Sequence, residues 1–173
     1  MGKPASQRDL AHFLTVVGFC VAMEVILSRF LSFHTMNMKI GLSFLPVVVA
    51  GYWGGPLAGG ITGLLGDVIG FVISPSGTYF PGFTLSSFLD GVIYGYFLKG
   101  NPGKKQILAA VLVVQLCISL CLNTFWLTIL LHISLQKLLY VRLFQSLSGI
   151  VIKTCVLFVV MPVLKERIPR GIE

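Results

Sequence analysis

Charged side chains are scarce in this sequence. Its 173 residues include 13 Lys and Arg and 6 Asp and Glu, so 11% of the chain is charged, against about 25% in an ordinary soluble domain. Apolar residues make up 55%, and the mean hydropathy is +0.91. A soluble fold of this length could not bury so much apolar surface, and the 13 Phe residues exclude a disordered chain. The composition therefore predicts an integral membrane protein.

The sequence also lacks the motifs of common catalytic and metal sites. It has no G-x-x-x-x-G-K-[ST], no H-E-x-x-H and no C-x-x-C, and its four cysteines lie in apolar runs. Its three histidines are too dispersed for a metal site, and its basic residues form no stripe for nucleic acid. We therefore expect no enzyme activity, no metal, no cofactor in this chain and no nucleic-acid partner.

Six apolar segments are separated by turn-forming or charged stretches, such as Gly54-Gly55-Pro56 and residues 99–105. A membrane span needs about 20 residues, so six spans leave room for short loops and seven do not. We expect an all-α bundle of six transmembrane helices, forming a single domain over residues 1–173. The expected spans cover residues 10–31, 40–53, 57–73, 83–98, 107–133 and 139–164.

The basic residues predict the orientation in the membrane. With an even number of spans both termini share a side, and that side carries eight Lys and Arg residues. The opposite loops carry only Lys39 and Lys137, with Arg29 and Arg142 near span ends. The positive-inside rule then places both termini in the cytoplasm and the loops at 32–39, 74–82 and 133–138 outside. The expected location is the plasma membrane, crossed several times.

Small residues recur at helical spacing on the first three expected spans. Such stripes let helices approach closely in lipid. They predict a docking face for another membrane subunit, and packing within this chain is an equally good explanation. The residues are Gly18, Ala22, Gly55, Ala58, Gly59, Thr62 and Gly66.

Ionisable residues within the expected spans are costly in hydrocarbon and should face a cavity or a partner. Glu24, Asp67, Asp90 and Lys153 are of this kind. Asp67 could bind a ring N–H group of a ligand or pair with a basic residue. Arg29 could bind a ligand carboxylate or extend to the membrane interface.

The expected outer side collects aromatic and polar residues. Stacking rings, amides and basic groups together suit a flat, heteroaromatic, anionic ligand. An aromatic belt at the membrane interface is the alternative, although it explains poorly an Asn within a span beside Trp126. The candidate binding residues of this group are Tyr79, Pro81, Phe83, Thr84, Asn123, Trp126, Arg142 and Gln145.

Several short motifs resemble the S components of energy-coupling-factor (ECF) vitamin transporters. The general features are Tyr52-Trp53-Gly54-Gly55-Pro56 and Gly66-Asp67-Val68-Ile69-Gly70. The runs Tyr79-Phe80-Pro81-Gly82-Phe83-Thr84-Leu85 and Asn123-Thr124-Phe125-Trp126-Leu127 resemble the folate-specific subgroup, as does Val141-Arg142-Leu143-Phe144-Gln145. The resemblance extends over nearly the whole chain.

This resemblance implies a six-helix subunit of a prokaryotic membrane that captures folate or a related pterin outside the cell. It implies docking to a transmembrane coupling protein that carries two cytoplasmic ATPases, so ATP would be used by the partner subunits. In that family the first span carries an Ala-xxx-Ala docking motif, and Gly18-xxx-Ala22 is the nearest equivalent here.

Residue chemistry suggests roles within such a site. The pterin would stack on Tyr79, Phe83 and Trp126. Its polar edge would be read by Asn123, Asp67 and Gln145, and the glutamate carboxylates would be held by Arg29, Lys39 or Arg142.

An S component for another vitamin, such as riboflavin, is the alternative within the same class. The outer loops contain no Asp or Glu, which disfavours the cationic vitamin thiamine. An intramembrane enzyme with Asp67 or His132 as general base lacks paired acid–base groups. A purely structural subunit does not explain the aromatic and polar outer side.

Overall fold

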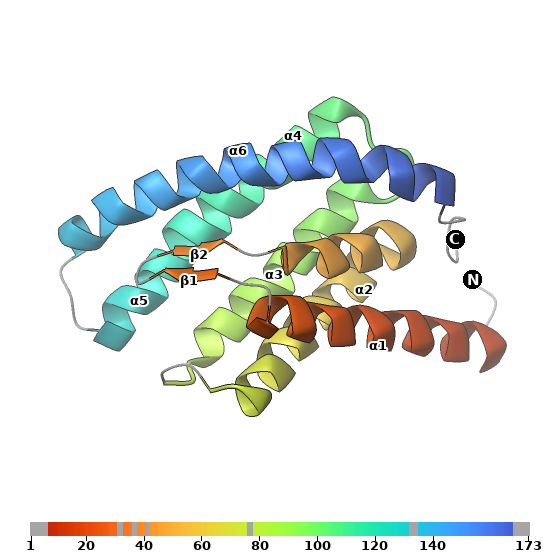
Figure 1. The fold of residues 1–173 in the computed structure, drawn as a ribbon, viewed down its shortest axis with the longest axis horizontal. Coiled ribbons are helices and arrows are strands. Elements are labelled where there is room, and N and C mark those ends of the chain that lie inside the picture. Colours follow the sequence, from red (N-terminus) through yellow and green to blue (C-terminus); the bar gives the residue numbers. More distant parts are fainter. Residues whose placement is uncertain are drawn as a thin grey trace, which may run out of the picture.

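The computed structural model describes residues 7–30, 33–35, 38–40, 42–75, 78–131 and 135–167. Helices dominate these ranges (Figure 1). They are α1 (Gln7–Phe30), α2 (Phe44–Ile73), α3 (Pro81–Leu98), α4 (Lys104–Val113), η1 (Val114–Leu122), α5 (Asn123–Leu131) and α6 (Leu135–Arg167). The beginning of α1 and the end of α6 lie at the same end of the bundle (Figure 1).

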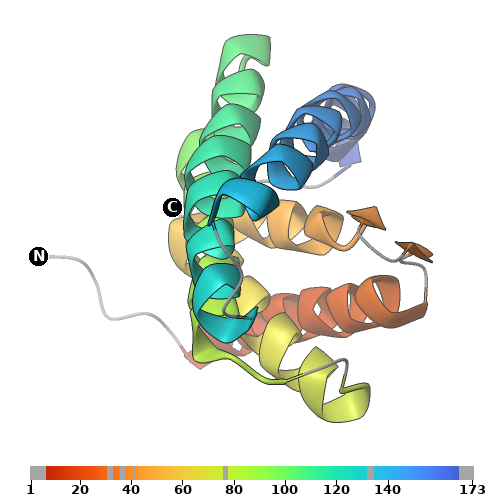
Figure 2. The same cartoon turned by 90° about the vertical axis from the view of Figure 1, so that its left-hand side faces the viewer.

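The loop expected at residues 32–39 contains the only departure from helix among the described elements. Strands β1 (Phe33–Thr35) and β2 (Met38–Ile40) pair antiparallel, with Phe33 opposite Ile40. The all-α expectation missed this ribbon because three-residue strands are too short to show an alternating pattern. The ribbon lies where α1 ends and α2 begins (Figures 1 and 2).

A break at Gly55 divides α2 into two helical segments. Gly55 has φ 75° and ψ −164°, and Pro56 follows it. A side chain at a positive φ is strained, so glycine suits this position, and proline has no N–H to continue the helical ladder. The break separates the two segments that the sequence predicted as spans 40–53 and 57–73, with a turn at Gly54-Gly55-Pro56. That turn is confirmed.

The helices α2 and α3 pack with their backbones in contact. A Cβ atom added at Gly51 would lie 2.9 Å from the backbone of Gly95, and one added at Gly59 would meet the carbonyl oxygen of Gly91. A Cβ at Gly63 would likewise meet the carbonyl oxygen of Ser87. Small residues permit this approach, and helix association in lipid depends on such contact.

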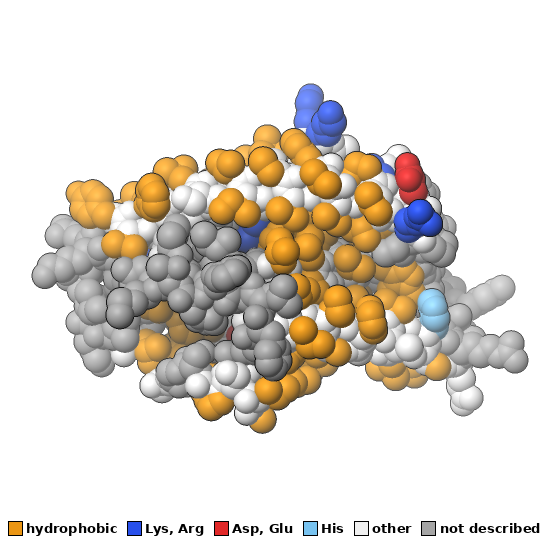
Figure 3. Space-filling model, in the orientation of Figure 1, with side chains coloured by type: hydrophobic (Ala, Val, Ile, Leu, Met, Phe, Trp, Pro, Cys, Tyr) orange, Lys and Arg blue, Asp and Glu red, His pale blue; other side chains and the backbone are white. Residues whose placement is uncertain are grey.

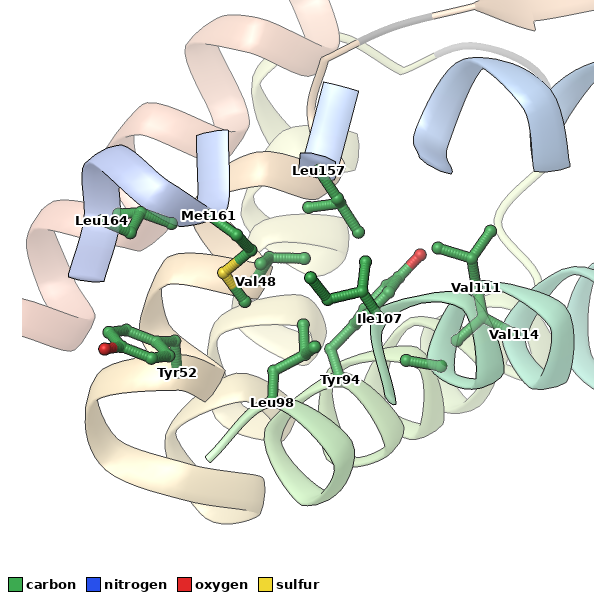
Figure 4. Close-up of a cluster of buried hydrophobic side chains, with 11 residues drawn as sticks. Val48, Tyr52, Tyr94, Leu98, Ile107, Val111, Val114, Leu157, Met161 and Leu164 are labelled. Carbon is green, nitrogen blue, oxygen red and sulfur yellow. The ribbon is translucent and has the colours of Figure 1, made fainter. Parts of the chain in front are cut away.

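An apolar core fills the space between α2, α3, α4 and α6 (Figure 4). Tyr94 and Leu98 come from α3, Val111 from α4, and Leu157 and Met161 from α6, and all five are buried. Figure 2 shows α1 and α6 on opposite sides of the first half of α2. The core therefore ties the C-terminal helices to α2 and α3, while α1 packs against α2 in a separate cluster.

Within the described residues, four helical stretches are long and apolar enough to cross a membrane: Leu10–Ser28, Phe44–Ile73, Lys104–Leu130 and Leu139–Arg167. The third is one continuous helical run through α4, η1 and α5. Large apolar side chains such as Phe19, Tyr140 and Val159 are exposed on the outer faces of the helices. Figure 3 shows apolar side chains covering most of the described surface on one face. This outer surface fits a lipid environment better than water.

Candidate functional site

A chain of hydrogen bonds joins α2 to the beginning of α3. The Thr84 hydroxyl donates to Asp67 Oδ2 over 2.7 Å, and the Tyr79 hydroxyl lies 3.0 Å from Thr84 Oγ1. Because Thr84 gives its one proton to Asp67, Tyr79 is the donor in the second bond. The Tyr79 ring also packs against Phe71, with centroids 5.1 Å apart. Three predicted residues, Asp67, Tyr79 and Thr84, therefore form one connected polar group.

An aromatic wall stands at the meeting of α3 and α5. The Phe80 ring centroid lies 5.5 Å from that of Trp126 and 6.0 Å from that of Phe83. Phe125 lies 5.2 Å from Trp126 by the same measure. The indole Nε1–H of Trp126 donates to Ser86 Oγ over 3.2 Å, which fixes the ring relative to α3. The predicted residues Phe83 and Trp126 are thus brought into one cluster.

Two residues at the beginning of α3 allow the wall to form. Pro81 lies in the first turn, where a missing N–H costs no helical hydrogen bond. Gly82 is buried against the rings, and a Cβ there would come 2.6 Å from Trp126 Cδ2. Sequence reasoning selected Pro81 but not Gly82 as a site residue, because only the structure shows how closely Trp126 approaches.

Several buried polar atoms have no hydrogen-bond partner among the described residues. An unsatisfied buried polar group costs about 1–3 kcal/mol, so each such atom calls for an explanation, such as an absent ligand or water. Asn123, which the sequence predicts as a binding residue, belongs to this set. The atoms are Glu24 Oε2, Asp90 Oδ1, Tyr94 OH, Asn123 Oδ1, Thr124 Oγ1 and Thr154 Oγ1.

Glu24 brings a carboxylate from α1 to this region. Its side chain packs directly against Gly66 of α2, where an added Cβ would overlap the carboxylate. It is close enough to Asp67 and Asp90 for their charges to interact. Sequence reasoning noted Glu24 as an ionisable residue in a span but gave it no place in the site.

A second polar group lies between η1 and α6. Lys153 Nζ donates to Gln115 Oε1 over 3.1 Å and lies 5.5 Å from the centroid of the Phe44 ring. The Ser146 hydroxyl donates to the Gln115 carbonyl oxygen over 3.0 Å, and Gln115 Nε2 donates to the Ser146 carbonyl oxygen over 3.4 Å. Gln115 lies in a nine-residue π-helix, a conformation frequent at functional sites. Sequence reasoning noted Lys153 as an ionisable residue in a span but missed Gln115 and Ser146, although an amide within an apolar run was a signal for the group.

The remaining predicted binding residues are less closely joined to these groups. Arg142 and Gln145 lie one turn apart on α6, and both are half-buried. The side chains of Arg29 and Lys39 lie outside the described residues, so their predicted roles stay predictions. Within the described ranges, no three His, Cys, Asp or Glu side chains gather as metal ligands would.

The predicted docking stripe divides between the interior and the surface. Gly55, Ala58, Gly59, Thr62 and Gly66 are buried among helices of this same chain. Packing within the chain, the alternative that the sequence left open, explains these five residues. Gly18 and Ala22 on α1 are exposed, and nothing lies within 4 Å of a Cβ added at Gly18.

Comparison with known proteins decides the family. The model of the family described as "ECF transporter, substrate-specific component" matches residues 12–172. The chain belongs to this family.

This S component is similar to proteins named as folate transporters. It is 39% identical over 136 residues to the folate transporter FolT of Clostridium novyi (strain NT), covering 78% of this chain and 79% of that protein. It is 29% identical over 126 residues to the folate transporter FolT of Leuconostoc mesenteroides subsp. mesenteroides, covering 72% and 67%.

A solved structure has a similar fold. A crystal structure described as FolT bound with folic acid matches with a TM-score of 0.75 and 32% identity, covering 83% of this chain and 87% of that one. The arrangement of helices in this S component is therefore that of a folate-bound relative over most of its length.

Proposed function

We propose that this chain is the folate-binding S component of an ECF-type importer, which captures folate outside the cell and releases it inside. The observation that carries the proposal is the likeness to FolT bound with folic acid, at 32% identity over 83% of this chain. The two relatives named as folate transporters support the same substrate.

The chemistry of the site suits this ligand. Folate has two aromatic units, the pterin and the benzoyl ring, and the wall of Phe80, Phe83 and Trp126 offers faces for stacking. Its glutamate carries carboxylates, for which Arg142, Arg29 and Lys39 are the basic candidates. Asn123, with a buried amide oxygen free of any described partner, is available to accept from a ring N–H or amino group.

The proposal extends to the membrane and to partner subunits. Six transmembrane helices with both termini in the cytoplasm follow if the two segments of α2 cross separately and α3 also spans. Docking to a transmembrane coupling protein with two ATPases would use the exposed small residues Gly18 and Ala22 on α1. Co-purification with a coupling protein should be lost in Ala22→Trp, and its retention would remove this face from the interface.

A competition experiment tests the substrate. The purified chain in detergent is loaded with labelled folic acid and challenged with unlabelled folic acid, riboflavin and thiamine. We expect displacement by folic acid alone. Displacement by riboflavin at comparable concentration would favour the other S-component function, and no bound label at all would contradict the proposed substrate.

A further inference from the structure

Asp90, Gln115 and Lys153 occupy equivalent positions on three packed helices. Each lies four residues, or about one turn, from a member of the apolar core. Asp90 precedes Tyr94 on α3, Gln115 follows Val111 of α4, and Lys153 precedes Leu157 on α6. Figure 4 shows Tyr94, Val111 and Leu157 gathered at the core, with the Tyr94 hydroxyl pointing toward the gap between the other two.

The displacement from each core residue to its polar neighbour has the same direction along the bundle. α3 and α6 run from the end with the aromatic wall toward the end where the chain starts, and the run from α4 to α5 goes the opposite way (Figure 1). The three polar residues therefore form a layer on the side of the core that faces the aromatic wall. Ser86, which binds the Trp126 indole, lies one further turn along α3 from Asp90. The layer is thus the floor beneath that wall.

The floor holds groups whose hydrogen bonding is incomplete. Asp90 Oδ1 is buried without a hydrogen-bond partner, although Lys153 is close enough for the two charges to interact. The Lys153 ammonium has three N–H donors and gives one of them to Gln115 Oε1. The Tyr94 hydroxyl next to Asp90 also has no partner among the described residues. A carboxylate acceptor on α3 and an ammonium donor on α6 therefore lie in the same layer, each with hydrogen-bonding capacity to spare.

Such a pair matches the pyrimidinone edge of a pterin. That edge presents two neighbouring donors, the 2-amino group and N3–H, followed by one acceptor, the 4-oxo oxygen. A carboxylate receives both donors, and an ammonium beside it donates to the oxygen. The distance between wall and floor also fits an elongated ligand. Asp90 lies nine residues from Pro81, at the beginning of α3 beside the aromatic wall, which is about 14 Å along the helix.

We propose that Asp90 and Lys153 read the pyrimidinone edge of the pterin at the floor of the site, with Gln115 as the residue that positions Lys153. This inference rests on the proposed function and names the residues that confer its substrate specificity. It places recognition of the pyrimidinone edge at Asp90 rather than at Asp67, whose Oδ2 atom already accepts from Thr84. It leaves the ring free to stack on Trp126 one turn above.

Two ligands that differ at the 4-position test the proposal. Folic acid carries a 4-oxo acceptor, and its 4-amino analogue aminopterin carries a donor there and lacks N3–H. Affinities of both are measured by titration calorimetry for the unmodified chain and for Lys153→Gln, Asp90→Asn and Asp67→Asn. Lys165→Gln is the matched control, because Lys165 lies on the same helix but donates to the Pro102 carbonyl oxygen near the other end.

The unmodified chain and Lys165→Gln should prefer folic acid by roughly 10- to 100-fold, the range for one hydrogen bond to a charged group. Lys153→Gln should lower this preference measurably, because an amide can both donate to the 4-oxo oxygen and accept from a 4-amino group, while Asp90 still selects for N3–H. Asp90→Asn should bind folic acid roughly 10- to 100-fold more weakly. The preference compares two ligands on one protein, so a partly inactive preparation does not change it.

The outcomes separate the two proposals. If the unmodified chain binds no folic acid, the proposed function fails. If it binds folic acid but Lys153→Gln keeps the full preference and Asp90→Asn keeps the affinity, the floor assignment is overturned and the function stands. A loss of folic acid affinity that is confined to Asp67→Asn also overturns the floor assignment, because the pyrimidinone edge is then read at Asp67. If Lys153→Gln does not fold, Gln115→Met is measured instead, because it removes the amide that holds the Lys153 ammonium. The assignment then requires that Gln115→Met lower the preference for folic acid over aminopterin.

Discussion

Thr84 shows how one hydroxyl serves two neighbours at once. It donates to Asp67 and accepts from Tyr79, and it is itself buried. Valine has nearly the same shape as threonine but no hydroxyl. In this position it would leave Asp67 Oδ2 with one hydrogen-bond donor fewer. The position therefore tolerates few replacements, and the local sequence, which marks Thr84 as a candidate binding residue, does not show its bond to Asp67.

Thr84→Val should lower the free energy of unfolding by about 1–3 kcal/mol, the cost of leaving a buried acceptor unsatisfied. Thr15→Val is the control, because the Thr15 hydroxyl bonds only the Ala11 carbonyl oxygen on an exposed face, and it should change stability by less than about 0.5 kcal/mol. Reversible denaturation in mixed micelles measures both. Equal effects at the two positions would show that the Asp67 group contributes nothing.

Trp126 combines a stacking face with an anchoring hydrogen bond. Trp126→Ala should weaken folic acid binding by roughly 1–3 kcal/mol, the range for stacking of a base on an aromatic side chain. Trp126→Phe keeps a ring and loses only the bond to Ser86, so it should cost about 0.5–1.5 kcal/mol. Calorimetric affinities that are unchanged in Trp126→Ala would remove this residue from the site.

At the scale of whole elements, α2 and α3 pack with their backbones in contact. Gly59→Ala should destabilise the protein by about 1–3 kcal/mol, because the new Cβ meets the Gly91 carbonyl oxygen and forces the helices apart. Gly18→Ala is the matched glycine control on α1, since its Cβ meets nothing within 4 Å. Thermal unfolding should separate the two variants clearly, and a Gly59→Ala melting temperature equal to that of Gly18→Ala would contradict the close packing.

The helices themselves could be predicted well from the sequence. Long apolar runs give α1, the run from α4 to α5, and α6, and the turn residues around Gly55 mark the break in α2. Two elements escaped prediction. The β1–β2 ribbon is too short for a periodic pattern, and the π-helix η1 has the same composition as an α-helix.

The site was predictable only in part, for a physical reason. The residues near the mouth share motifs such as Tyr79-Phe80-Pro81, so their chemistry is visible in short runs. Gln115, in contrast, meets Ser146 and Lys153 from 31 and 38 residues away. Likewise, Gly66 looks the same in sequence whether it faces a partner protein or, as here, the Glu24 side chain. Pairings of this kind depend on the tertiary fold.

At the scale of the whole molecule, the described chain has an apolar outer surface and places several ionisable residues in its interior beside the apolar core. The exposed faces carry Phe19, Tyr140 and Val159, while Glu24, Asp90 and Lys153 point inward. This arrangement is typical of a membrane protein whose ionisable residues serve a site within the bundle. The helix α3 contributes both to the aromatic wall, through Ser86, and to the polar floor, through Asp90, so a bound ligand should contact both along this helix.

Titration calorimetry of folic acid into the purified chain, without any partner subunit, tests the central claim most directly. We predict saturable binding of about one folic acid per chain, because the wall and the floor described above come entirely from this chain. Riboflavin and thiamine, titrated in parallel, should give no comparable heat. Absence of saturable folic acid binding by a chain that remains monodisperse and folded would contradict the account.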